Sequence, residues 1–209
     1  RVIQLPSGRL VVPAACHTSP TGKGLAPGVA MCFLSDDEGK TWRQSETVLK
    51  APEGSRSGLQ EPGVVELKDG RVMMLSRTDQ GCHLRSWSAD GGETWSPVER
   101  TDLLAPVSPA TFERIPKTGD LLIVWNNHRE IAPALRGKRT PLCTAISRDE
   151  GLTWENVKTI EDDPEGWFCY MAMEFVGDRV LLAYCATTTG LPHLSRTQIT
   201  TFDVDWLYR

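Results

Sequence analysis

A turn motif of eight residues occurs three times in this chain and constrains its fold more than any other sequence feature. Each copy reads Ser-x-Asp-x-Gly-x-Thr-Trp, an Asp box, and the copies lie at Ser35–Trp42, Ser88–Trp95 and Ser147–Trp154. The aspartate can accept hydrogen bonds from turn amides, the glycine permits a positive φ, and the tryptophan can pack across a sheet. Because the motif recurs with each repeat, we expect its aspartates to be structural rather than calcium ligands or catalytic acids.

A second repeated unit consists of a strand-like run, a glycine-containing tight turn and another apolar run, which is the signature of a β-hairpin. It occurs four times, at Leu5–Val12, Leu67–Met74, Ile115–Ile123 and Phe175–Leu182.

A further β-like run and an Asp box follow each of the first three hairpins, at Val29–Leu34, His83–Trp87 and Leu142–Ile146. The fourth repeat ends in a strand-like run from Thr197 that has no Asp box behind it. Four strands in each repeat, with repeats about 50 to 60 residues apart, are typical of propeller blades. The sequence therefore predicts an all-β chain of about four blades.

Composition excludes several classes of function. With 209 residues and 40% apolar content, the chain can bury a real core. A net charge of −4 with dispersed Lys and Arg predicts no nucleic-acid partner, and no apolar run approaches a membrane span. The start at Arg1, without an initiator Met or a signal-peptide layout, suggests a segment of a longer protein. For that full-length parent a secreted or periplasmic location is favoured.

The six cysteines have no Cys-x-x-Cys spacing for zinc or redox chemistry, and most lie within or beside apolar runs. We interpret them as small buried hydrophobes in strands, which leaves the compartment open. His17, His83 and His193 have no partner at metal-site spacing, so we expect no metal and no cofactor.

The Asp boxes, together with a hairpin sequence such as Gln60–Gly70, resemble the sialidase (neuraminidase) superfamily of BNR/Asp-box repeat proteins. The resemblance extends along essentially the whole chain. It implies a six-bladed β-propeller, of which residues 1–209 represent a single segment of about four blades.

The resemblance also implies a site for a sialylated or other acidic glycan. The family binds the sugar carboxylate with arginines, because a guanidinium fork matches a carboxylate bidentately. Arg77 and Arg139 match two of these arginines, and Tyr170 resembles the nucleophile of the family. At neutral pH a phenol is a poor nucleophile unless a neighbouring base takes its proton, and Glu61 matches the glutamate that is this base in the family. One departure is Met171, because the family usually has a small residue directly after the tyrosine.

The implied activity is that of an exo-α-sialidase-like glycoside hydrolase, which acts with retention through a covalent intermediate. The first arginine and the acid/base aspartate of the family lie on blades N-terminal to the repeats present. We therefore expect this segment alone to lack a donor for the leaving group. In the loop after the third hairpin, Asn127 and His128 are candidates for contact with a sugar hydroxyl.

Two other interpretations remain open at this stage. One is a non-catalytic carbohydrate-binding Asp-box propeller that kept the arginines and lost turnover. The other is a structural propeller that presents protein-binding surfaces, in which Glu61, Arg77, Arg139 and Tyr170 would not converge on one pocket.

Overall fold

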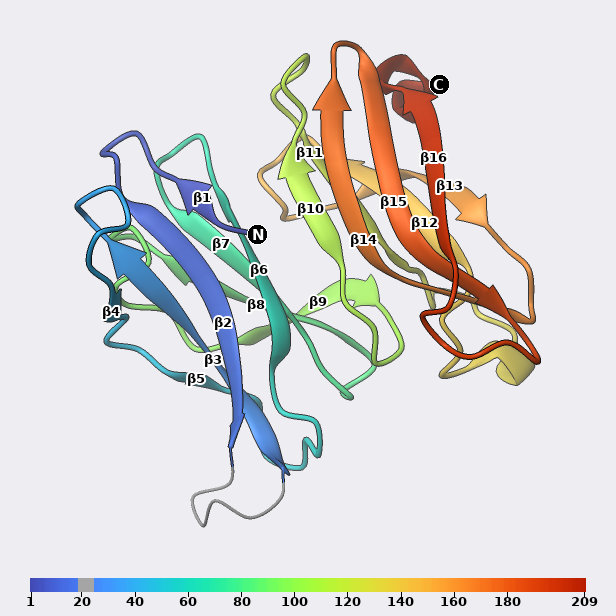
Figure 1. The fold of residues 1–209 in the computed structure, drawn as a ribbon, viewed down its shortest axis with the longest axis horizontal. Helices are drawn as coiled ribbons and strands as arrows, with labels where there is room; N and C mark the ends of the chain where they lie inside the picture. Colours follow the sequence, from blue (N-terminus) through green and yellow to red (C-terminus); the bar gives the residue numbers. More distant parts are fainter. Residues whose placement is uncertain (19–24) are drawn as a thin grey trace. The chain divides into compact units, whose positions relative to one another are not determined.

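The computed structural model describes residues 1–18 and 25–209, and these residues form four antiparallel β-sheets. Figure 1 shows that strands dominate both halves of the chain. Two short 3₁₀ turns, η1 (Pro133–Leu135) and η2 (Val204–Tyr208), are the helical elements of the described part. The predicted all-β architecture is confirmed.

Two compact units divide the chain at Asp102/Leu103, and each unit contains two blades. The first blade contains β1 (Ile3–Gln4), β2 (Leu10–Thr18), β3 (Leu25–Ser35), β4 (Arg43–Gln44) and β5 (Leu49–Lys50). The second blade contains β6 (Gln60–Glu66), β7 (Val72–Arg77), β8 (Cys82–Ser88) and β9 (Glu99–Leu104).

The second unit also contains two blades. Its first blade, the third of the chain, contains β10 (Thr111–Arg114), β11 (Leu121–Asn126), β12 (Leu142–Ser147) and β13 (Glu155–Glu161). The fourth blade contains three strands, β14 (Gly166–Val176), β15 (Arg179–Thr188) and β16 (Thr197–Asp203).

All four predicted hairpins join the first two strands of a blade. In the fourth blade, Val176 pairs directly with Arg179, so the connection is a two-residue loop. Gly177 in this loop has φ +57, a conformation that most other residues adopt only under strain. The hairpin prediction is therefore correct in each blade.

The three Asp boxes form the same hydrogen-bonded turn after the third strand of their blades. In the first box, the Asp37 carboxylate accepts from Thr41 N at 2.9 Å and from Thr41 Oγ1 at 2.6 Å. Ser35 Oγ donates to Asp37 and accepts from Gly39 N, each at 2.8 Å. Matching bonds hold the boxes of Asp90 and Asp149. These bonds agree with the predicted structural role of the aspartates.

The tryptophans of the boxes are not equally buried, although the motif is the same. Trp95 is buried, whereas Trp42 is 44% exposed. The second box contacts the first blade at Trp95, whose backbone N donates to Thr47 Oγ1 at 3.1 Å. Packing of the tryptophan across a sheet therefore depends on a neighbouring blade as well as on the motif.

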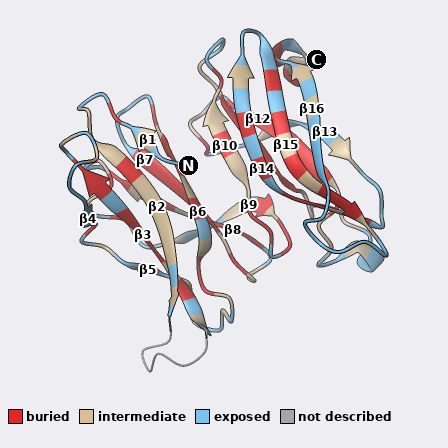
Figure 2. Ribbon diagram, viewed as in Figure 1, coloured by how far each residue is buried: buried red, intermediate tan, exposed pale blue. Residues whose placement is uncertain are grey.

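Each unit has its own buried apolar residues (Figure 2). Every residue of β11 and β12 is buried, as expected for central strands covered on both faces. In the second unit, the core cluster joins these strands to β14, β15 and η2. All six cysteines are free and lie in strands, and four of them are buried, which agrees with the sequence interpretation apart from the exposed Cys16.

Within the described residues, the model contains no helix of the length and apolar character that a membrane crossing requires.

Candidate functional site

Glu61 and Arg77 lie on neighbouring strands of the second blade and form an ion pair. Arg77 Nη1 donates to Glu61 Oε2 at 2.8 Å, and the arginine side chain is 14% exposed. Arg77 ends β7 and pairs with Gln60, and the register then shifts between Gln60 and Gly63. This shift places Glu61 in a β-bulge, which directs its side chain toward the end of β7.

Tyr170 occupies the equivalent bulge of the fourth blade. The register of β14 against β15 shifts between Cys169 and Ala172, as it does between Gln60 and Gly63 in the second blade. Tyr170 has φ +55 and Glu61 has φ +44, which are rare values for residues other than glycine. Such backbone conformations cost about 1–3 kcal/mol each and are concentrated at functional sites.

Arg139 lies beside Tyr170 in the second unit. Its Cζ is 5.3 Å from the centroid of the Tyr170 ring and 4.5 Å from that of Trp167. Arg139 Nη2 donates to the Val107 carbonyl at 3.2 Å, whereas Nη1 is buried without a hydrogen-bond partner in the described part of the chain. Tyr170 is 41% exposed. An exposed phenol therefore contacts a guanidinium that lacks one hydrogen-bond partner among the described residues.

Met171, the departure from the family pattern, does not enter this arrangement. Its side chain is 7% exposed and belongs to the core cluster of the second unit. Because the bulge turns Tyr170 outward and Met171 inward, the size of Met171 affects the core and not the exposed face.

Among the described residues, three buried polar atoms without a partner belong to the adjacent strands β6, β7 and β8 of the second blade. They are Gln60 Oε1, Arg77 Nε and His83 Nε2. Burial lowers the pKa of His83 to about 4; a bond with the Ser76 backbone opposes this, and the charge of Arg77 adds to it. His83 is therefore neutral at neutral pH and adds no second positive charge beside Arg77.

Within each unit, the structure brings two of the predicted site residues together. Glu61 is bonded to Arg77 in the first unit. Its predicted partnership with Tyr170, a residue of the second unit, stays a prediction. Tyr170 contacts Arg139 in the second unit. The roles assigned to these four residues stay predictions.

Trp167 is a site residue that the sequence analysis missed. Residues three apart in a regular strand point to opposite faces, so spacing alone separates Trp167 from Tyr170. The bulge at Tyr170 changes this alternation, and the two rings meet edge-on with centroids 6.4 Å apart. No signal in the sequence marks the position of that bulge.

Asn127 and His128, the candidates for sugar contact, are engaged within their own loop. Asn127 Oδ1 accepts from Arg129 N at 2.9 Å, and His128 Nε2 lies 3.0 Å from the Lys138 carbonyl. Burial lowers the pKa of His128, although hydrogen bonds with the Lys138 and Thr140 backbone oppose the shift.

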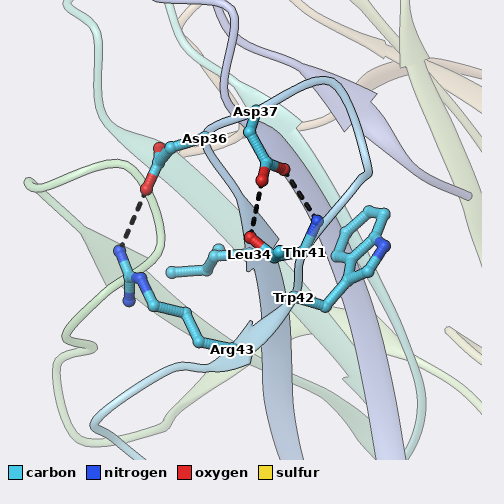
Figure 3. A pocket seen from close by; sticks show the side chains of 6 residues that line it. All are labelled: Leu34, Asp36, Asp37, Thr41, Trp42 and Arg43. Carbon is cyan, nitrogen blue, oxygen red and sulfur yellow. Dashed lines mark hydrogen bonds and ion pairs between the residues drawn. The ribbon is translucent and has the colours of Figure 1, made fainter.

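A hollow of about 210 Å³ lies at the first Asp box and contains none of the four predicted site residues. Figure 3 shows Asp37 turned toward Thr41 of the same turn and Asp36 toward Arg43 of β4, so both carboxylates already have partners in the first blade. Hydrogen bonds from Thr41 and Ser35 lower the pKa of Asp37 to about 2. The hollow is lined by Leu34, Asp36, Asp37, Thr41, Trp42 and Arg43.

Histidine, cysteine, aspartate and glutamate side chains form no group of three or more that could hold a metal ion in residues 1–18 and 25–209.

Comparison with known proteins finds one matching family model, the BNR repeat-like domain, over residues 1–185. A sialidase of Micromonospora viridifaciens is 38% identical over 141 residues, which cover 63% of this chain and 20% of that protein. An anhydrosialidase of the leech Macrobdella decora is 33% identical over 91 residues, which cover 43% of this chain and 10% of that protein. The chain thus matches a fifth or less of the length of these two relatives.

Solved structures match nearly the whole chain at lower identity. A leech intramolecular trans-sialidase complexed with 2,7-anhydro-Neu5Ac superposes with a TM-score of 0.72 and 20% identity. The match covers 99% of this chain and 31% of that protein. At this identity the similarity establishes the fold, so the four sheets are blades of a sialidase-like propeller.

Proposed function

The chain belongs to the BNR repeat-like family and to the sialidase superfamily, and on that premise we propose that it carries part of the active site of a sialidase. The sialidase relatives support a sialidase-like glycosidase. Its substrate in this proposal is a glycan that ends in sialic acid. The supporting observation is that Tyr170 and Arg139, an exposed phenol and an incompletely paired guanidinium, stand together at a strained bulge.

In the proposed reaction, Arg77 and Arg139 bind the carboxylate of the sugar. Guanidinium groups suit this task because they keep their charge at any working pH and bind both carboxylate oxygens. The half-buried setting of Arg77 strengthens its electrostatic attraction relative to a fully solvated arginine.

The Tyr170 oxygen then attacks the anomeric carbon, and the phenolic proton passes to the Glu61 carboxylate. The bond from the anomeric carbon to the leaving oxygen breaks, and a tyrosyl-glycoside forms. Water then attacks the anomeric carbon from the face that the leaving group left, opposite Tyr170. The bond to the Tyr170 oxygen breaks and Tyr170 recovers its proton, so the anomeric configuration is retained. We assign no residue of this chain to protonation of the leaving group.

A non-catalytic sugar-binding propeller is the second candidate, and the Glu61–Arg77 ion pair is the observation that favours it. A carboxylate held by an arginine is less available as a base toward Tyr170. This candidate predicts binding of sialic acid without turnover.

The test is turnover of a fluorogenic sialoside by the full-length protein that contains this chain. Replacement of Tyr170 by Phe removes only the nucleophilic oxygen, and we expect kcat to fall by at least about 10³-fold. Tyr208→Phe is the matched control, because Tyr208 is bonded to Asp120 and Thr118; its kcat is expected to stay near that of the unmodified protein.

Three results contradict the proposal in different ways. Binding of sialic acid without turnover by the unmodified protein selects the non-catalytic candidate. Equal turnover by Tyr170→Phe removes Tyr170 from the mechanism. Release of the β-anomer of free sialic acid from an α-sialoside, followed by NMR before mutarotation, excludes retention.

A further inference from the structure

Two aromatic side chains contact the Arg139 guanidinium and form a stack with it, and the proposed reaction uses Tyr170 but gives no role to Trp167. We propose that Trp167 is a positioning residue, which holds the Arg139 guanidinium in the orientation that receives the substrate carboxylate. This inference rests on the proposed function for the identity of the ligand, but its structural part can be tested without any ligand.

Trp167 is the nearest aromatic partner of the guanidinium. Arg139 Cζ lies 4.5 Å from the Trp167 ring centroid, closer than its 5.3 Å from the Tyr170 ring. A guanidinium over an aromatic face within about 6 Å is attracted by the ring quadrupole, most strongly for tryptophan. The two rings meet edge-on, so together they limit the directions in which the guanidinium can turn.

Few other groups fix the guanidinium. Arg139 makes no ion pair with a carboxylate among the described residues, and its one hydrogen bond is from Nη2 to the Val107 carbonyl. Nη1 is buried and has no partner in the described part of the chain. A buried, charged donor without a partner costs free energy that a bound carboxylate would recover. The stack therefore orients the group, while no carboxylate of the described residues neutralises its charge.

The backbone holds Trp167 and Arg139 side by side. Phe168 N donates to the Arg139 carbonyl at 2.9 Å, so the residue after Trp167 is bonded to the loop that carries Arg139. Next to it, the Lys138 ammonium donates to Glu165 at 3.0 Å. These bonds tie the loop before β12 to the start of β14.

His193 covers Trp167 as a further layer of the stack. The two ring centroids are 4.5 Å apart with planes tilted by 38°. His193 lies in the connection between β15 and β16, and Thr189 of the same connection donates to Glu165 at 2.5 Å. The stack thus runs from this connection through Trp167 to Arg139 and Tyr170.

A second arginine–tryptophan pair in the chain provides a matched control. Arg85 Cζ lies 4.7 Å from the Trp87 ring centroid, but Arg85 Nη2 is also 2.8 Å from the Glu99 carboxylate. The geometry of the stack is similar, whereas the guanidinium is already neutralised. Loss of Trp87 should therefore not affect a carboxylate ligand.

The ligand-free experiment measures hindered rotation about the Nε–Cζ bond of Arg139 by NMR of protein with ¹⁵N-labelled arginine. The Arg139 signals are assigned by their loss in Arg139→Lys. We expect slow rotation in the unmodified protein, fast rotation in Trp167→Ala and intermediate rotation in Trp167→Phe. Rotation in Trp87→Ala should equal that of the unmodified protein, and equal rotation in Trp167→Ala would overturn the inference.

The second measurement is the affinity for N-acetylneuraminic acid and for its uncharged 1-amide, in the full-length protein. Trp167→Ala should weaken binding of the acid by roughly 2- to 30-fold and binding of the amide much less. Trp167→Phe should recover part of the loss. Equal weakening for acid and amide would indicate a general packing role and would also overturn the inference.

Failure of the proposed function gives a different result. If the unmodified protein binds neither the acid nor the amide, the sialic-acid ligand is wrong. The rotation measurement still decides whether Trp167 holds Arg139.

Discussion

At the scale of single residues, the site combines strained backbone with incompletely paired polar atoms. Glu61 and Tyr170 adopt positive φ at equivalent bulges, and each lies beside an arginine with a buried nitrogen that has no partner in residues 1–18 and 25–209. Native proteins leave few such atoms, and each requires a structural or functional reason. In the proposed function, the carboxylate of the ligand supplies that reason.

The titration of His83 leads to a prediction about pH. The pKa of His83 is about 4 in the folded chain, because of its burial first, against about 6.5 in an unfolded chain. Between these two pH values, His83 binds a proton in the unfolded state but not in the folded state. Its contribution to the free energy of unfolding is therefore fully present above pH 6.5 and is lost as the pH decreases toward 4. From pH 7 to pH 5 the loss attributable to His83 is about 2 kcal/mol.

Urea unfolding of the unmodified chain and of His83→Gln at pH 7 and pH 5 measures this loss. The variant should lack the part of the pH dependence that His83 contributes. If both proteins lose the same free energy of unfolding, His83 does not titrate as its burial requires.

At the scale of elements, the same Asp-box turn has a different environment in each blade. A Cβ added to Gly92 would lie 3.2 Å from Val11 and 3.3 Å from Leu34 of the first blade. At Gly39 the nearest atom would be 3.5 Å away, in Trp42 of the same turn. The second box is therefore an interface element, whereas the described contacts of Gly39, with Trp42 and Leu10, lie within its own blade.

Alanine at these two glycines separates backbone strain from crowding. Gly39→Ala, at φ +85, should lower the free energy of unfolding by about 1–2 kcal/mol through backbone strain. Gly92→Ala, at φ +91, carries the same strain and should lose a further 1–3 kcal/mol or so through overpacking against the first blade. The measurement is urea unfolding followed by the fluorescence of tryptophan, and equal losses would contradict the packing of the second box.

At the scale of the whole molecule, each of the two compact units has its own buried core. In the second unit, η2 follows β16 at the place where an Asp box follows the third strand of the other blades. Its Val204 and Leu207 are buried in the same cluster as Ile146 of β12. A 3₁₀ turn thus supplies packing at a position where the fourth repeat has no box.

Removal of the Leu207 side chain tests the contribution of η2. Leu207→Ala should destabilise the second unit by about 2–5 kcal/mol, because a fully buried leucine leaves a cavity. Amide hydrogen exchange in β11 and β15 measures the loss of protection. Leu152→Ala is the control, because this side chain is 61% exposed, and it should change protection little. If Leu207→Ala changes protection as little as Leu152→Ala does, the packing of η2 is dispensable.

The strand pattern, the hairpins and the Asp boxes could be predicted from the sequence because each is determined within a few residues. In the first box, the hydrogen bonds of the Asp37 carboxylate, the Ser35 hydroxyl and the Trp42 indole all join residues from Ser35 to Trp42. Glycine turns and short-range side-chain bonds carry the same information in any context. Residue types and a family resemblance also identified the four candidate site residues.

The side-chain partners at the site were decided by tertiary structure alone. Two β-bulges determine that Glu61 meets Arg77 and that Tyr170 turns toward Trp167, and a one-residue shift of register has no marker in the sequence. Burial of Trp95 likewise depends on a neighbouring blade. The sequence determined the local turns and strands of this protein, whereas the contacts of its site depend on strand register and on packing between neighbouring segments, which no local pattern encodes.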